Sequence, residues 1–212
     1  MKAQKVKTII YNYIRQNIYS ENINELLVDK DFNEYAYFYN CYPYLFSSAF
    51  GNIEKEKMEC FNIASFLCYK AVVLRDDFID KVKPNSQDYN RLEVSKLFFK
   101  EATALLSEIF IPQSSFWAYW EKRKYELEST EYQDKQLAIS FLNYEDYETF
   151  ADNKSAFAKL AIDGLYVLSG EFYTEAHEAL LSSHREFSIA MQLFDDLFDV
   201  DEDLQNKQFN LA

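Results

Sequence analysis

Residues 192–203 read QLFDDLFDVDED, and the spacing of their charged and apolar side chains decides the fold class. Asp195, Asp199 and Asp203 recur at every fourth position, so on a helix their carboxylates form one stripe. Phenylalanines, leucines and a valine lie between them, which distinguishes the segment from a disordered acidic tail. The pattern therefore predicts an amphipathic helix with one acidic face.

A second copy of the Asp-Asp-x-x-Asp pattern occurs in AVVLRDDFIDKV, residues 71–82. Asp76 and Asp80 lie one helical turn apart, and Asp77 lies about 100° around the helix from Asp76. Three carboxylates within one turn repel each other, and the C-terminal end of a helix disfavours negative charge. This position calls for a cation, and hard oxygen ligands at this density suit Mg²⁺ together with substrate phosphate oxygens.

Helical spacing of apolar residues continues through most of the chain, and no stretch alternates as a strand would. Because there is no internal repeat and no low-complexity linker, we predict one all-α domain over residues 1–212, a bundle of roughly seven to nine helices. Gly164 and Gly170 should break or kink one helix near its end. The predicted helices cover residues 5–18, 32–50 with an interruption at Pro43, 53–81, 88–110, a segment that starts after Pro112, 144–168 and 182–206.

Composition restricts the partners and the location of the protein. The formal net charge of −13 repels phosphate backbones, so we expect no nucleic-acid partner. The densest basic run, residues 121–124, reads as a solvated helix face. The three cysteines form no C-x-x-C and read as reduced core residues. No apolar stretch is long enough for a signal peptide or a membrane span, so we expect a soluble cytoplasmic protein without membrane insertion.

Three further features have simple interpretations when each is taken alone. Aromatic residues make up 18% of the chain, which fits a bulky helical core more simply than an aromatic-lined pocket. His177 and His184 lie seven positions apart and read as packing or surface residues rather than metal ligands. Lys154 is followed by the small residues Ser155 and Ala156, so a ligand can approach it closely, although a solvated lysine is the simpler interpretation.

Taken together, these motifs resemble those of a known superfamily. The two aspartate clusters are similar to the two aspartate-rich motifs of trans-isoprenyl diphosphate synthases, and Lys154-Ser155-Ala156 looks like the Lys-Thr element between them. The segment from Gln192 to Phe209 also resembles the second motif of squalene and phytoene synthases. The resemblance is to the class I isoprenoid synthase superfamily and covers about residues 54 to 209.

The resemblance implies an all-α bundle and a reaction. It implies that the two clusters face each other across a cavity mouth and hold Mg²⁺ ions that grip an allylic prenyl diphosphate, which Lys154 and Gln192 also touch. Ionisation would give an allylic carbocation inside a dry aromatic cavity. The implied catalytic and metal-binding residues are Asp76, Asp77, Asp80, Asp195, Asp196 and Asp199, with Asp203 as a further metal ligand.

Departures from the family pattern favour one type of member. Chain-elongating members carry Gly-Lys-Arg near the N-terminus and Arg-Arg after the first motif, and this chain has neither. We therefore expect a terpene synthase-like lyase that uses one diphosphate. A chain-elongating or head-to-head prenyltransferase is the alternative. An all-α nucleotide pyrophosphohydrolase is disfavoured because both clusters lack its Glu-x-x-Glu spacing.

The position of the second cluster near the end of the sequence gives a further expectation. Members of this superfamily usually continue with additional helices, so we expect a bundle of the isoprenoid synthase type that lacks the last helices. Such a chain is a compact member, a truncated product, or a protein that needs a homodimer or a partner subunit to close its cavity. A non-catalytic binding subunit of the same superfamily is the remaining alternative.

Overall fold

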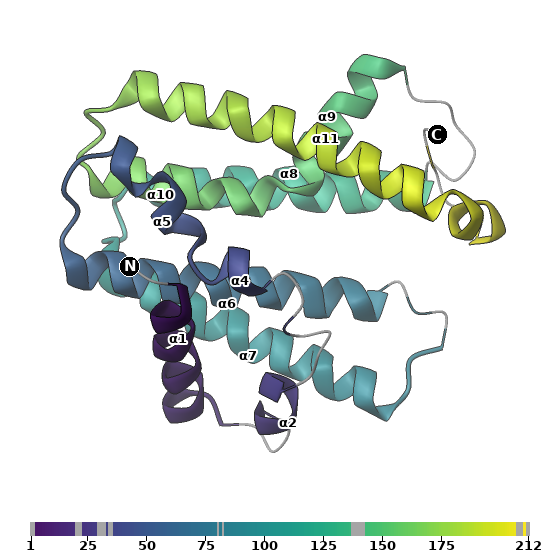
Figure 1. Cartoon of the computed structure of the whole chain (residues 1–212), viewed down its shortest axis with the longest axis horizontal. Helices are drawn as coiled ribbons and strands as arrows, with labels where there is room; N and C mark the ends of the chain where they lie inside the picture. Colours follow the sequence, from purple (N-terminus) through teal and green to yellow (C-terminus); the bar gives the residue numbers. More distant parts are fainter. Residues whose placement is uncertain are drawn as a thin grey trace. The chain divides into compact units, whose positions relative to one another are not determined.

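The computed structural model describes residues 3–19, 23–28, 33, 36–79, 81, 83–136, 143–206 and 210, and for residues 3, 25, 36–37, 131–136 and 202–206 it describes the backbone alone. Every regular element in these described residues is a helix (Figure 1), which confirms the all-α prediction. The chain divides into two compact units, residues 1–114 and 115–212, which are described separately below. The single domain expected over the whole chain stays a prediction.

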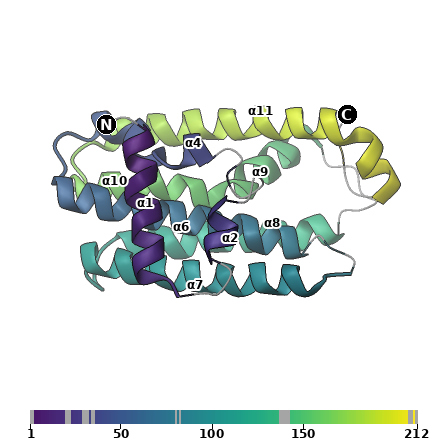
Figure 2. The same ribbon diagram turned by 60° about the horizontal axis from the view of Figure 1, so that its bottom comes forward.

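The first unit is organised by two long helices that pack along each other (Figures 1 and 2). They are α6 (Lys55–Ile79) and α7 (Ser86–Ile109), close to the ranges that periodicity predicted. Asn85 begins α7, because its side chain accepts from the backbone N–H groups of Gln87 and Asp88, and the Asp88 carboxylate accepts from the Asn85 N–H. This reciprocal cap satisfies backbone donors that a helix start leaves unpaired.

Shorter helices complete the first unit. They are α1 (Ala3–Asn17), α2 (Ile23–Val28), α4 (Ala36–Tyr39), α5 (Tyr42–Phe46) and the 3-10 turn η1 (Ser47–Ala49). The interruption predicted at Pro43 is confirmed, since Pro43 lies in the first turn of α5. Proline is tolerated there because the first N–H groups of a helix have no intrahelical partner. Ile10 and Ile14 of α1 are fully buried.

The second unit contains α8 (Phe116–Gln136), α9 (Tyr144–Lys154), the 3-10 turn η2 (Ala156–Lys159), α10 (Leu160–Leu168) and α11 (Thr174–Asn206). Helix α11 packs against α9 and α10, and α8 packs against α9, η2 and α10. The continuous helix predicted over 144–168 is wrong, because the chain leaves helical geometry at Ser155 (φ −100°, ψ 14°). The start predicted at residue 182 is also wrong, since α11 begins at Thr174.

The glycines act differently from one another. Gly164 is buried inside α10 and does not break it, contrary to prediction. Gly170 follows the end of α10 with φ +80°, a conformation that glycine adopts at little cost. A Cβ atom at this position would lie 2.8 Å from the ring of Phe172. Glycine is therefore favoured at position 170, where the chain turns from α10 toward α11.

Within the described part of the chain, no helix combines the length and the apolar character that crossing a membrane requires.

Candidate functional site

The first aspartate cluster lies at the C-terminal end of α6, in the first unit. Asp76 and Asp77 are both exposed, and Asp80 lies outside the described residues. The last turn of α6 carries no basic residue, so nothing within that turn offsets the negative end of the helix dipole. Two adjacent carboxylates therefore lie at the negative end of the α6 dipole, where a nearby cation is stabilising.

The cations that follow the first cluster are engaged by carboxylates. Arg91 Nη2 lies 3.5 Å from Asp77 Oδ2, and the Lys81 ammonium forms a short ion pair with Asp88. Asp88 belongs to the cap of α7, so Lys81 is directed to the start of that helix. Both cations therefore neutralise acidic groups of the first unit.

An aromatic cluster lies on the same face of α6 as Asp76. Tyr69 precedes Asp76 by seven positions, two helical turns or about 10 Å along the axis. Its ring stacks on that of Tyr39, with 3.7 Å between centroids and 14° between planes. Tyr42 lies 5.4 Å from Tyr39 and extends the cluster. One face of α6 thus presents aromatic rings and then carboxylates.

The second cluster contains two kinds of aspartate. Asp195 and Asp199 are exposed, whereas Asp196 is only 4% exposed. Tyr147 Oη donates to Asp196 Oδ2 at 2.9 Å, and Gln192 Nε2 donates to Asp196 Oδ1 at 2.7 Å. Both oxygens of the buried carboxylate therefore accept from protein donors.

Tyr147 is a residue that sequence reasoning missed. It is fully buried on α9, in a small core with Ala151 and with Ile189 of α11. Burial, together with the hydrogen bond to Asp196, raises the pKa of Tyr147 well above its ordinary value, so the phenol remains a donor at neutral pH. No sequence signal indicated its partner, which lies 49 positions further along the chain.

Lys154 is the last residue of α9 and is exposed. Its Nζ lies 5.6 Å from the centroid of the Phe150 ring, within the range of a cation–π contact. The helix ends directly after it, which places the ammonium at the negative end of the α9 dipole. Within the second unit, Lys154 is thus an accessible cation at a helix break.

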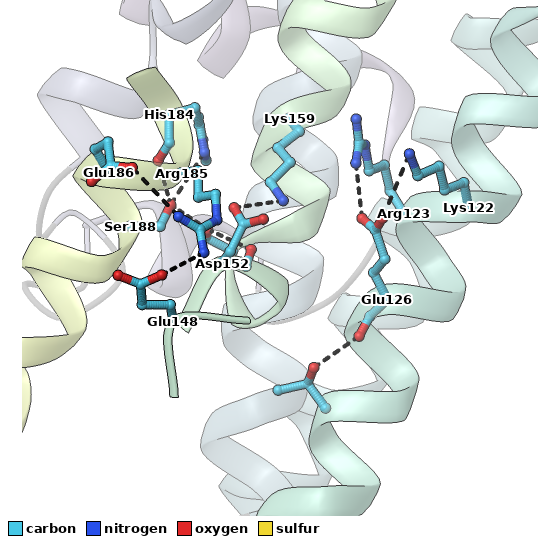
Figure 3. Close-up of polar contacts among 12 residues, drawn as sticks. Lys122, Arg123, Glu126, Glu148, Asp152, Lys159, His184, Arg185, Glu186 and Ser188 are labelled. Atoms are coloured by element: carbon cyan, nitrogen blue, oxygen red, sulfur yellow. Dashed lines mark hydrogen bonds and ion pairs between the residues drawn. The ribbon is translucent and has the colours of Figure 1, made fainter. Parts of the chain in front are cut away.

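Polar contacts hold this break and connect α9 to α11, as Figure 3 shows. The hydroxyl groups of Ser155 and Ser188 are 2.6 Å apart, and Arg185 Nη2 donates to Glu148 Oε2 at 2.8 Å. Across the break, Lys159 Nζ lies 2.6 Å from Asp152 Oδ1 (Figure 3). These contacts therefore fix the break between α9 and η2 against α11, the helix that carries the second cluster.

A buried ion-pair network lies at α8, α10 and α11, and it corrects one prediction. Arg123, expected on a solvated face, is only 4% exposed, and its Nε donates to Asp163 Oδ2 at 2.8 Å. His177 Nε2 lies 2.8 Å from Asp163 Oδ1. Burial raises the pKa of Asp163, but the hydrogen bonds from His177 and Arg123 outweigh it and hold that pKa below its ordinary value.

The other histidine is buried as well. His184 Nδ1 lies 3.2 Å from the Ser188 hydroxyl. Burial, reinforced by the positive charge of Lys159, lowers the pKa of His184 to about 4. Both histidines thus occupy the interior of the second unit, as packing residues do.

The predicted metal ligands are only partly described. Among the residues whose side chains are described, no group of three or more Asp, Glu, His or Cys side chains is placed to hold a metal ion. Asp80 and the side chain of Asp203 lie outside those residues. Asp195 and Asp199 are exposed one turn apart on α11, which fits Mg²⁺, because this ion commonly takes one or two carboxylates and completes its shell with phosphate oxygens and water. The ligand set and the facing of the two clusters stay predictions.

Comparison with known proteins identifies the fold. No family model and no curated protein matches the chain. A crystal structure of geranyltranstransferase from Thermotoga maritima matches with a TM-score of 0.70 and 20% identity, over 100% of this chain and 81% of that one. An isoprenoid synthase family member from Thermotoga neapolitana matches with a TM-score of 0.69 and 18% identity, over 98% and 82%. The chain has the isoprenoid synthase fold, as the motifs predicted.

Proposed function

We propose that this protein is a Mg²⁺-dependent enzyme that ionises an allylic prenyl diphosphate and releases pyrophosphate. The resulting cation would cyclise or rearrange before it loses a proton or takes up water. The observation that supports the proposal is that a chain with the isoprenoid synthase fold carries exposed aspartates in both of its Asp-Asp-x-x-Asp clusters, one on α6 and one on α11.

The aspartates would have two roles. Asp195 and Asp199 would hold Mg²⁺ from α11, and Asp76 and Asp80 would do so from α6, with Asp77 and Asp203 as further ligands. When bound, Mg²⁺ would supply the charge neutralisation that a departing diphosphate requires. Asp196 would instead orient the site, because its oxygens already accept from Tyr147 and Gln192.

The side chains of this chain would assist departure and protect the cation. Lys154, exposed at the end of α9, would donate to the diphosphate oxygens. As the allylic C–O bond breaks, its electron pair would leave with the diphosphate and the hydrocarbon would retain the positive charge. The stacked rings of Tyr39 and Tyr69 would offer aromatic faces that attract a cation.

Two basic residues near the first aspartate cluster bear on how many diphosphates the protein binds, because each of them is paired with a carboxylate. A prenyltransferase binds two diphosphates and needs a second cationic pocket. Lys81 and Arg91, which follow the first cluster, are engaged by Asp88 and Asp77. Together with the absence of the Gly-Lys-Arg and Arg-Arg motifs from the sequence, this supports the lyase over the chain-elongating alternative.

Product analysis tests the proposal. Purified protein with Mg²⁺ is incubated with geranyl, farnesyl or geranylgeranyl diphosphate, each alone and with isopentenyl diphosphate, and the organic extract is analysed by mass spectrometry. We expect pyrophosphate release from an allylic substrate alone, without acceleration or a longer product when isopentenyl diphosphate is added. An extended prenyl diphosphate as the main product would establish the prenyltransferase instead. The absence of turnover in every combination would favour the non-catalytic subunit.

A further inference from the structure

The outer face of α11 carries an exposed apolar stripe. It consists of Phe187, Met191, Phe194 and Phe198, which are 48%, 50%, 57% and 84% exposed. Their spacing of four, three and four positions is that of a coiled-coil seam, so they lie along one side of the helix over about 16 Å. Leu197 is also exposed and widens the stripe at its C-terminal end.

The opposite face of α11 is packed inside the second unit. Ile189 belongs to the core that includes Tyr147, and Asp196 accepts from Tyr147. A surface helix with one packed face usually carries polar residues on the other. A second apolar face indicates that α11 has another partner, because contiguous exposed apolar patches mark interaction sites.

Acidic side chains border the stripe. Asp195 follows Phe194 directly, Asp201 lies two turns beyond Phe194 on the same face, and Glu186 precedes Phe187; all three are exposed. The chain as a whole has a formal net charge of −13. An apolar seam with an acidic border complements a helix whose apolar seam is bordered by lysine or arginine.

We propose that the stripe of residues 187–198 docks a cationic amphipathic helix of another protein. The spacing of the stripe favours a helical partner. Apolar side chains that recur every three or four positions on a partner helix would pack between the stripe residues. The acidic border selects basic flanks. A second copy of this chain fits less well, because it would bring the same acidic border and the same net charge.

Fluorescence anisotropy with two synthetic peptides tests the charge and the seam together. Both peptides carry leucine at the seam positions of three heptads; one has lysine elsewhere and the other has glutamate. The full chain is titrated at physiological salt, where weak long-range attraction is screened. We expect saturable binding of the lysine peptide and no binding of the glutamate peptide.

Substitutions then separate the stripe from general acidic attraction. Phe194→Ser combined with Phe198→Ser leaves the net charge unchanged, and we expect it to weaken binding of the lysine peptide by at least about tenfold. Phe172→Ser is the matched control, since Phe172 is also 84% exposed in the same unit, and it should bind as the unmodified chain does. If the double variant folds poorly by circular dichroism, Phe198→Ser alone is used.

Several results would overturn the proposal. If the lysine peptide bound the double variant as tightly as the unmodified chain, the net charge alone would explain the binding. If the glutamate peptide bound as tightly as the lysine peptide, the acidic border would have no role. Failure of both peptides to bind would exclude the docking surface. Sedimentation of a dimer that Phe198→Ser converts to monomer would assign the stripe to a second copy, and binding to anionic vesicles through these residues would assign it to a membrane surface.

Discussion

Tyr147 and Asp196 form a buried hydrogen bond, with 2.9 Å between Oη and Oδ2, that joins α9 to α11 beside the exposed Asp195. Because the carboxylate is 4% exposed, the loss of this donor leaves an acceptor in the interior without one of its partners. The contact therefore contributes to the stability of the second unit. It also distinguishes the buried Asp196 from the exposed Asp195 that precedes it.

Removing the Tyr147 hydroxyl should destabilise the protein. We expect Tyr147→Phe to lower the free energy of unfolding by about 1–3 kcal/mol, because the Asp196 carboxylate loses a buried donor. The measurement is urea denaturation with an unchanged m-value. Tyr144→Phe is the control, since Tyr144 is exposed on the same helix and should shift stability by less than about 0.5 kcal/mol. Equal effects of the two substitutions would contradict a special role for Tyr147.

Metal and pyrophosphate should stabilise the protein together. If the clusters hold Mg²⁺ against phosphate oxygens, Mg²⁺ with pyrophosphate should raise the melting temperature more than either alone. Asp76→Ala or Asp195→Ala should abolish this increment. Asp201→Ala removes an equal charge from an exposed position on α11 and should retain it. Unchanged increments in the first two variants would count against the metal site.

Buried Arg123 and its exposed neighbour should respond differently to the same substitution. Arg123→Met leaves the fully buried Asp163 without its bidentate partner, and we expect a loss of about 3–5 kcal/mol in the free energy of unfolding. Lys122→Met, on the same turn of α8, should cost less than about 1 kcal/mol, because the Lys122 side chain is exposed and its Nζ lies 3.9 Å from Glu126. Urea denaturation measures both, and similar losses would mean that Arg123 is not buried as described.

The stability of the protein should fall in mildly acidic solution because of His184. The unfolded histidine takes up a proton near pH 6.5, whereas the folded one resists until about pH 4. Between these values the unfolded state binds more protons, so stability decreases as the pH falls, by on the order of 2 kcal/mol at pH 5. Chemical denaturation at pH 7.5 and pH 5 measures this decrease.

His184→Asn isolates the contribution of that residue. The asparagine amide keeps a polar atom near Ser188 but does not titrate, so this part of the pH dependence should disappear. The remaining acid sensitivity should arise at lower pH, where carboxylates such as Asp163, whose pKa is held below its ordinary value, become protonated. A pH dependence identical to that of the unmodified chain would contradict this assignment.

The positions of the main helices followed from local chemistry. Apolar periodicity over 53–81 and 88–110 predicted α6 and α7, because a packed helix must present one apolar face. The interruption at Pro43 could be predicted because proline has no backbone N–H to continue a helix. The acidic clusters were also visible in the sequence, since an interval of four places carboxylates on one face of a helix in any tertiary context.

The surroundings of individual side chains were decided by tertiary structure. Asp195 and Asp196 are consecutive and chemically identical, yet only Asp196 is buried against Tyr147, 49 positions earlier. Arg123 reads like the lysines on either side of it, but its partner Asp163 lies 40 positions away. The break at Ser155 is held by Ser188, 33 positions further on. Periodicity describes the neighbours of a residue on its own helix, whereas burial and hydrogen bonding depend on partners that folding brings from elsewhere in the chain.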